Sequence, residues 1–255
     1  MVDRGYQHNF SRMVDGAMYN HLARERKAKT ILAVLKDFLN GKALSSLTLL
    51  DVGSSTGIID NYLADHFLKV IGIDIDEEAI GFATETFQKP NLKFEVDDLM
   101  GLSIPDEIFD VAICTQIYEH VPDAQTMIKE IFRILKPRGI CYFAAGNRIT
   151  LMEPHYRLPL LSMLPVPLAH LYMRLAGKGN HYHEKHLYLP GLKKLVNRFI
   201  VHDYTKKTIE DPEKFSTDYM LIPGSMKHKM GKLIVKYAYW LCPTYIWILE
   251  KPNMH

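Results

Sequence analysis

Leu47-Thr-Leu-Leu-Asp-Val-Gly-Ser-Ser-Thr-Gly-Ile-Ile-Asp60 consists of a short apolar run, a turn with two glycines, and the beginning of a second apolar segment. The apolar residues up to Val52 predict a buried strand, and the residues after Gly57 predict a helix. Glycine suits a turn in which the backbone takes a positive φ or lies close to a ligand. This strand, turn and helix predict a nucleotide-type ligand at the carboxyl end of a parallel strand.

The glycine spacing tests one kind of nucleotide, a dinucleotide. Its fingerprint, G-x-G-x-x-G, places backbone against a pyrophosphate. If Gly53 is the first glycine, the other two should stand at positions 55 and 58, which hold Ser55 and Ile58. An NAD(P)-dependent oxidoreductase is therefore the alternative rather than the favoured interpretation.

An acidic residue ends the next apolar run. Asp74 closes the run 69–74 and lies 21 residues after Gly53. A carboxylate at this distance accepts hydrogen bonds from the hydroxyl groups of a ribose in nucleotide-binding folds. Asp74 is thus the predicted ribose ligand.

Apolar runs and amphipathic segments alternate along most of the chain, which predicts an α/β fold with a doubly wound, mostly parallel sheet. The predicted strands are 47–52, 69–74, 92–96, 104–114, 140–145, 200–205 and 243–252, with a turn at 136–139 before the fifth. The predicted helices are 20–39, 58–66, 77–87, 124–135 and a segment within 185–199.

Six short motifs in order resemble the landmarks of the class I S-adenosylmethionine-dependent methyltransferases. They are Leu49-Leu-Asp-Val-Gly, Gly72-Ile-Asp, Val96-Asp-Asp-Leu, Phe109-Asp-Val, Tyr118-Glu-His-Val-Pro-Asp and Leu135-Lys-Pro-Arg-Gly. The resemblance covers 47–147 and implies a Rossmann-like, seven-stranded sheet with helices on both faces and an antiparallel last strand. At the position of Ser55 the family usually has a glycine.

The resemblance also implies which residues bind S-adenosylmethionine. The small residues of the first turn would accommodate its amino-acid end, Asp74 the ribose, and Asp98 the adenine amine, although the adjacent Asp97 could take that place. Gln116 would face the methionine portion, and Leu99 would line the adenine ring. The predicted cofactor-binding residues are Asp51, Gly53, Ser54, Ser55, Gly57, Asp74, Ile75, Asp98, Leu99 and Gln116.

Histidines suggest the chemistry of the transfer. A base assists when the methyl acceptor is a hydroxyl group, and the candidates for it are His120, His155 and His183. We therefore expect methylation at oxygen, with carbon and nitrogen acceptors left open. The run His181-x-His183-x-x-His186, with Glu184, has ligand types that suit zinc or iron. Its spacing matches no metal signature, so substrate contacts are the preferred role and no metal is expected.

The domain organisation follows from what surrounds the motifs. We expect a single methyltransferase domain over 1–255, with a helical cap at 1–41 and substrate-cap insertions at 147–187 and 207–242. In the cap helix, Ile31 and Leu35 fall on the predicted buried face and Arg24 does not. A non-catalytic S-adenosylmethionine-binding protein remains a further alternative.

The two insertions hold the only sequence clue to the acceptor. Residues 158–173 are very apolar, and 227–240 combine apolar residues with four lysines. Such a face can lie on an anionic membrane surface, although a helix that packs on the sheet has the same pattern. We expect a small-molecule or lipid-linked acceptor, such as a glycolipid or a quinone-like molecule, with possible peripheral membrane contact.

Composition and charge set limits on the remaining possibilities. The net charge of +2 and the absence of a long basic run argue against a nucleic-acid partner. Cys114, Cys141 and Cys242 form no C-x-x-C pair and predict buried free thiols in a reducing compartment. We find no signal-peptide pattern and no apolar run of about 20 residues, so a cytoplasmic protein is expected. The oligomeric state stays open.

Overall fold

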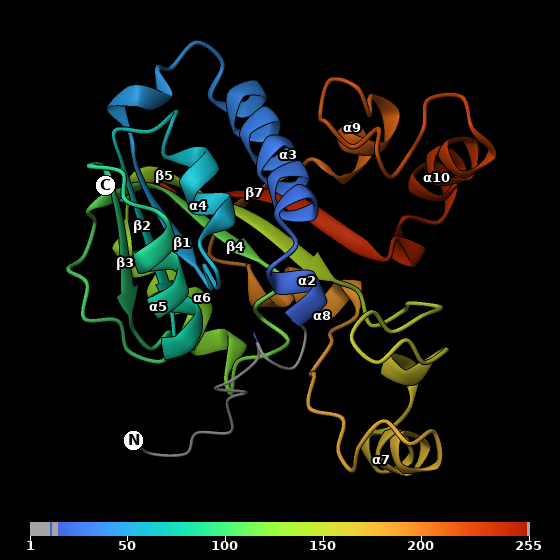
Figure 1. The fold of residues 1–255 in the computed structure, drawn as a ribbon. Helices are drawn as coiled ribbons and strands as arrows, with labels where there is room; N and C mark the ends of the chain where they lie inside the picture. Colours follow the sequence, from blue (N-terminus) through green and yellow to red (C-terminus); the bar gives the residue numbers. More distant parts are fainter. Residues whose placement is uncertain (1–10, 12–14, 254–255) are drawn as a thin grey trace.

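A seven-stranded sheet forms the centre of the molecule (Figure 1). The computed structural model describes Ser11 and residues 15–253, so most of the first 14 residues of the expected N-terminal cap lie outside the described part. The strand order is β3-β2-β1-β4-β5-β7-β6. The strands are β1 Thr48–Val52, β2 Lys69–Asp74, β3 Leu92–Val96, β4 Phe109–Thr115, β5 Leu135–Gly146, β6 Ile200–Asp203 and β7 Thr244–Glu250.

Strand directions confirm the predicted fold class. β1 to β5 pair in parallel, and β7 lies antiparallel to both β5 and β6. The order reverses between β1 and β4, because the chain first builds outward to β3 and then returns to the other side of β1. In such sheets ligands bind at the carboxyl ends of the strands near this reversal.

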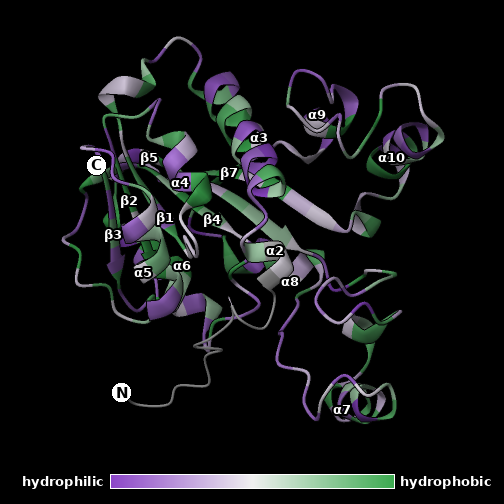
Figure 2. Ribbon diagram, viewed as in Figure 1, coloured by the Kyte–Doolittle hydropathy of each residue, from purple (hydrophilic) through white to green (hydrophobic). Residues whose placement is uncertain are grey.

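Helices cover both faces of the sheet because alternate strand residues are apolar on both sides. Leu49 packs into one buried cluster with α3 and α4, while Leu50 packs into the other with α6 and α8. Hydropathy colouring shows the apolar strands between these layers (Figure 2). The bounds of these four helices, and of two further helices in this part of the chain, are α2 Asp15–Met18, α3 His21–Leu39, α4 Ile58–Leu63, α5 Glu77–Thr86, α6 Ala124–Ile134 and α8 Leu189–Leu195.

The α3 helix differs from its prediction on one side. It begins after Asn20, whose side chain accepts a hydrogen bond from the Ala23 N–H, and it buries Ile31 and Leu35 as expected. Arg24, however, is also buried, with 8% of its surface exposed. It stands four residues before the buried Ala28, on the same helical face.

β5 is longer than predicted. It starts at Leu135, which pairs with Phe109, and the pairing resumes at Ile140 opposite Val111. The predicted turn at 136–139 is therefore an irregularity inside the strand, where Arg138 has a φ of 62°. Because residues 136–139 are typical of a turn, the predicted strand began only at 140, and the pairing of Leu135 was not predicted.

The segments expected as caps stand beside the carboxyl edge of the sheet (Figure 1). The first has its own small apolar cluster and carries α7; the second carries α10, which packs against α9. Among the described residues, no helix is both long and apolar enough to cross a membrane. The three cysteines are buried free thiols, as predicted. The remaining elements are η1 Leu44–Ser46, η2 Leu161–Met163, α7 Val166–Leu175, α9 Thr205–Glu210, α10 Met226–Tyr237 and η3 Tyr239–Leu241.

Candidate functional site

The turn after β1 is held against β2 by its backbone. The N–H groups of Gly53 and Ser54 both donate to the Ile73 carbonyl, at 2.8 and 3.0 Å. Gly53 has a φ of 84°, and a Cβ there would lie 2.2 Å from Cδ1 of Ile117. Ser55 also has a positive φ, 51°, which explains why the resembled family usually has a glycine at this position.

Asp74 is fixed at the end of β2. Its carboxylate accepts hydrogen bonds from the Ser55 N–H at 2.8 Å and the Asp76 N–H at 3.0 Å. Burial raises the pKa of Asp74, and these two N–H groups oppose that rise. Each carboxylate oxygen has a second lone pair, so the positioned side chain can still accept hydrogen bonds from two ribose hydroxyls.

A buried charge cluster lies behind the turn. Arg24 of α3 interacts electrostatically with Asp51, Asp60 and Asp74. Burial, together with the neighbouring Asp60, raises the pKa of Asp51 well above its usual value, and burial raises that of Asp60 to about 7. The Arg24 Nε has no hydrogen-bond partner among the described residues.

Arg24 and its neighbour Lys27 were not predicted as site residues. Both line the cavity described below, and desolvation together with Arg24 lowers the pKa of Lys27 to about 8. A signal for Arg24 existed, because it continues the helical spacing of the buried Ala28 and Ile31.

The turn after β3 brings Asp97 rather than Asp98 to the cavity. Asp97 accepts the Asp98 N–H at 2.8 Å, and Asp98 accepts the Met100 N–H at 2.8 Å. Leu99 is buried and lines the cavity beside Asp97. Asp97, the predicted alternative to Asp98, therefore lines the cavity, and Asp98 does not.

One cavity of about 940 Å³ connects these residues to the caps. It extends from Asp74 to α9 and α10, and its wall includes both polar turn residues and apolar cap residues. Predicted site residues that line it are Gly53, Ser55, Asp74, Ile75, Leu99, Gln116, His120 and His155. The lining does not include Asp51, Ser54, Gly57, Asp98 or His183.

Two of the three predicted histidines meet at the cavity wall. The rings of His120 and His155 pack edge to face with centroids 4.9 Å apart. Burial and the neighbouring His155 lower the pKa of His120 to about 3. His183 is exposed, because the segment 181–186 is extended and turns only alternate residues inward.

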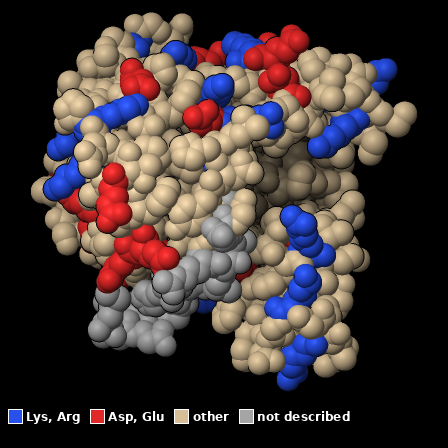
Figure 3. Space-filling model, in the orientation of Figure 1, with Lys and Arg blue, Asp and Glu red and all other residues tan. Residues whose placement is uncertain are grey.

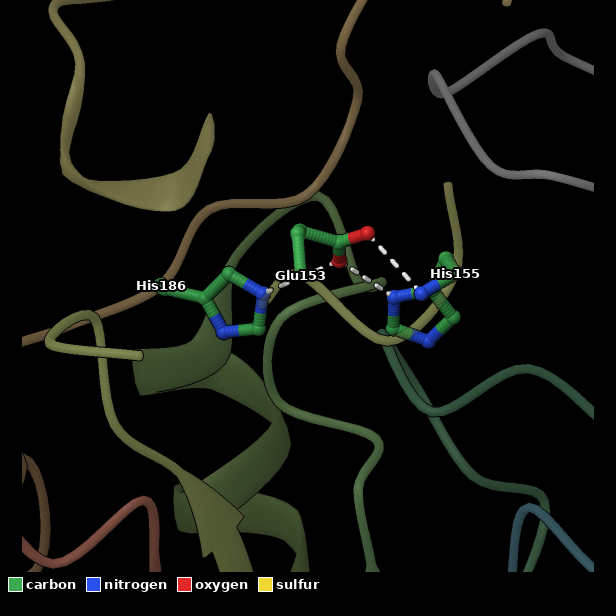
Figure 4. A group of neighbouring side chains, drawn as sticks. All are labelled: Glu153, His155 and His186. Carbon is green, nitrogen blue, oxygen red and sulfur yellow. Dashed lines mark hydrogen bonds and ion pairs between the residues drawn. The ribbon is translucent and has the colours of Figure 1, made fainter. Parts of the chain in front are cut away.

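His155 belongs to a buried group that the sequence did not reveal (Figure 4). Its Nδ1 lies 2.7 Å from Oε1 of Glu153. Burial lowers the pKa of His155, but the Glu153 carboxylate outweighs it, and the net direction is upward. Hydrogen bonds outweigh burial at Glu153 too and lower its pKa to about 2. His186 approaches the same oxygen at 3.9 Å.

Comparison with known proteins gives a family match for the part of the chain that contains the turn after β1 and Asp74. A family model described as a methyltransferase domain matches residues 50–143. Residues 50–143 therefore match the domain of the class I, S-adenosylmethionine-dependent methyltransferases. The cofactor of these methyltransferases is S-adenosylmethionine, and the turn after β1 and Asp74 lie in the matched range.

Named relatives match only part of the chain. A ubiquinone biosynthesis O-methyltransferase from Coxiella burnetii is 35% identical over 102 residues, 39% of this chain and 44% of the relative. A 2-methyl-6-phytyl-1,4-hydroquinone methyltransferase from Synechocystis is 41% identical over 103 residues, 40% of this chain and 32% of the relative. The chain thus aligns with less than half the length of either methyltransferase.

The fold likeness extends further than the sequence likeness. An S-adenosylmethionine-dependent methyltransferase from Mesorhizobium loti superposes with a TM-score of 0.58 at 16% identity, over 87% of this chain and 97% of that one. Residues 147–187 and 207–242, the expected caps, lie outside the residues matched by the family model.

Proposed function

We propose that this methyltransferase transfers the methyl group of S-adenosylmethionine to a hydroxyl oxygen of a hydrophobic or lipid-linked acceptor. The observation that carries the proposal is the single cavity that joins Asp74 to the apolar caps. A cavity of this size and mixed lining can hold a cofactor and part of an acceptor together.

The cofactor would lie at the Asp74 end. Asp74 accepts the ribose hydroxyls, Asp97 meets the adenine amine, and Leu99 lines the adenine ring. Arg24 pairs with the α-carboxylate of the methionine portion, because its guanidinium is buried beside the cavity. Gln116, which has a φ of 59° and lines the cavity, contacts the same portion.

The transfer is a displacement at carbon. The acceptor oxygen forms a bond to the methyl carbon while the bond from that carbon to sulfur breaks, and the sulfur leaves as a neutral thioether. No acid is needed for the leaving group. Holding the oxygen and the methyl group in line supplies most of the acceleration, up to about 7–11 kcal/mol.

The acceptor hydroxyl has to lose its proton during the transfer. We propose that His155, which is held by Glu153, accepts this proton. His155 lines the cavity, and the 2.7 Å contact with Glu153 orients its ring. His120 lines the same wall. His183 is left out of the proposal because it does not line the cavity.

The caps support an apolar acceptor. Met230 and Ile234 of α10 line the cavity, and further apolar side chains of both caps face outward. Figure 3 shows a hollow between the two caps with basic side chains on both sides. The relatives named above are quinone-pathway and hydroquinone methyltransferases by their names, which agrees with an aromatic hydroxyl on an apolar chain.

An acceptor series tests this proposal. Purified protein is incubated with methyl-labelled S-adenosylmethionine and pairs of hydroxylated aromatic compounds, each with or without a long apolar tail. We expect label in the tailed compounds, as a methyl ether, and little in the tailless ones. Transfer only to tailless compounds would reject the apolar acceptor, and label at carbon or nitrogen would reject methylation at oxygen.

A further inference from the structure

Polar side chains around Glu153, His155 and His186, beside the acceptor end of the cavity, lack hydrogen-bond partners in the described part of the chain. Glu119 is 1% exposed and His186 is 8% exposed. Among the described residues, the two carboxylate oxygens of Glu119 and the two ring nitrogens of His186 have no hydrogen-bond partner. Oε2 of Glu184 is in the same condition. A buried polar atom without a hydrogen-bond partner destabilises the fold. Several such atoms in one place therefore indicate that a ligand binds there and contacts them.

Three side chains of this group converge. One ligand atom each from Glu153, His155 and His186 lie within 4.8 Å of one another. Figure 4 shows the Glu153 carboxylate between the two imidazoles. Zinc sites place nitrogen and oxygen ligands at about 2.0–2.2 Å from the ion, so small side-chain rotations bring these three atoms around one ion.

The backbone holds the three residues in place before any ligand binds. Oε2 of Glu153 accepts the N–H groups of His155 and Tyr156, both at 2.8 Å. The segment that carries His186 is tied on both sides: Lys185 N–H donates to the Glu119 carbonyl, and Leu187 N–H donates to the Tyr118 hydroxyl, both at 3.0 Å. Such support is typical of a metal site.

Further carboxyl groups lie around the three side chains. Besides Glu153, the carboxyl groups of Glu119 and Glu184 interact electrostatically with His155. A Cβ at Gly146 would lie 3.4 Å from both Oε1 of Glu119 and Cε1 of His186, so Glu119 stands beside the convergent group. Two imidazoles and a carboxylate, with a further carboxylate close by, match the ligand set of catalytic zinc and related divalent transition metals.

We propose that Glu153, His155 and His186 bind a divalent transition-metal ion at the acceptor end of the cavity. The expectation from the sequence was no metal, and the histidine run 181–186 considered there supplies only His186. Its other two histidines, His181 and His183, are exposed, and their rings are tilted to each other with centroids 6.0 Å apart.

An ion at this place also deepens the proposed function, on which this role alone rests. His155 lines the cavity, so an acceptor oxygen can take the open position of a three-ligand site. Coordination lowers the pKa of a bound hydroxyl group. An acceptor hydroxyl bound to such an ion would lose its proton to water in the cavity, and its oxygen would then attack the methyl carbon as described above. The ion would in that case take over the activation of the acceptor from His155, which would hold the ion.

Calorimetric titration of Zn²⁺ into the full, chelator-treated chain without a histidine tag tests the site. We expect one ion per chain, with affinity lowered by about 10- to 100-fold or more in Glu153→Gln and in His186→Asn. The matched control is His202→Asn, because His202 and Glu250 form a comparable pair, 2.9 Å apart, on the far strands. That variant should bind zinc as the wild type does.

Two further measurements make the outcome decisive. Each variant is titrated with S-adenosylmethionine, so that a variant with normal cofactor affinity is known to be folded. A second titration with Co²⁺, followed by visible absorption, reports coordination directly. Absence of saturable zinc binding in the wild type, or zinc affinity in both site variants equal to that of the wild type, would overturn the metal proposal. Methyl transfer by the metal-free chain would leave the proposed function standing and would overturn only the role of the ion in the transfer.

Discussion

Asp74 shows how one residue can be both structural and available to a ligand. Its two oxygens align the turn after β1 with the turn after β2 through backbone N–H groups. The carboxylate is therefore oriented before a cofactor arrives, which lowers the entropy lost on binding.

Replacement of Asp74 by Asn should weaken S-adenosylmethionine binding. Loss of charge-assisted hydrogen bonds costs about 1.5–3 kcal/mol, or about 10- to 150-fold in Kd. Calorimetry measures the change, with the exposed surface substitution Asp65→Asn as the control. Equal affinities in the two variants would remove Asp74 from the cofactor site.

Features that depend on residues close together in the sequence could be predicted. Contacts between residues that only folding brings together could not. The positions of Gly53 and Asp74 at the ends of strands could be predicted because strand, turn and spacing are local properties. The contact between Glu153 and His186 depends on how the segment 147–187 folds, which no local pattern specifies. The choice of Asp97 over Asp98 depends on which carboxyl group caps the following turn.

At the scale of elements, the junction between β1 and α4 depends on Gly57. This residue has a φ of 71°, and a Cβ there would lie 2.5 Å from the Phe94 ring and 2.8 Å from Cβ of Ala83. The same close packing joins α4 to β3 and α5, so the position is restricted by both backbone conformation and space.

Substitution of Gly57 by Ala should lower the free energy of unfolding by about 2–4 kcal/mol, because a left-handed conformation and overpacking both add a cost. Gly81→Ala is the matched control: nothing lies within 4 Å of the new Cβ, and it lies within α5. That change should instead raise stability by about 0.5–1 kcal/mol. Denaturant unfolding measures both, and equal effects would contradict the packing argument.

Asp37 links α3 to the start of the second cap. Its carboxylate accepts hydrogen bonds from Lys214, Tyr204 and Lys207, and these partners, Lys214 first, lower its pKa to about 2. The folded pKa lies below the unfolded one, so this stabilisation is present above about pH 4. It is lost as the pH falls toward 2.

Asp37→Asn should therefore reduce stability at neutral pH by about 1 kcal/mol, a figure lowered from the full pKa shift because the lysine partners are largely exposed. The difference from the wild type should shrink between pH 4 and pH 2. Urea unfolding across this range measures it. A difference that stays constant with pH would show that the Asp37 carboxylate charge does not stabilise the fold.

At the scale of the whole molecule, the sheet was predictable, and the path of the two segments expected as caps was not. Apolar strands of period and length typical of a parallel sheet specify the order of elements, and the antiparallel β7 follows from the family resemblance. The caps pack through few buried residues, such as Leu161 and Met173 in the first. Their path therefore depends on contacts that sequence periodicity does not encode.

Exposed apolar side chains of α10, beside its lysines, predict binding to anionic vesicles. Met226 and Tyr237 are 78% and 71% exposed. Replacement of both by Ser should reduce sedimentation with anionic vesicles, and neutral vesicles should bind little of the wild type. His228 hydrogen-bonds to Gly224 and Ile209, so α10 keeps its place in the variant. Equal sedimentation of variant and wild type would argue against α10 as the contact.

The central claim is that the cavity binds S-adenosylmethionine at its Asp74 end. The most direct test is calorimetric titration of the purified chain with S-adenosylmethionine and, in parallel, with NADH. We predict saturable binding of S-adenosylmethionine to one site per chain and no binding of NADH. Binding of NADH alone would contradict the account and favour the oxidoreductase alternative.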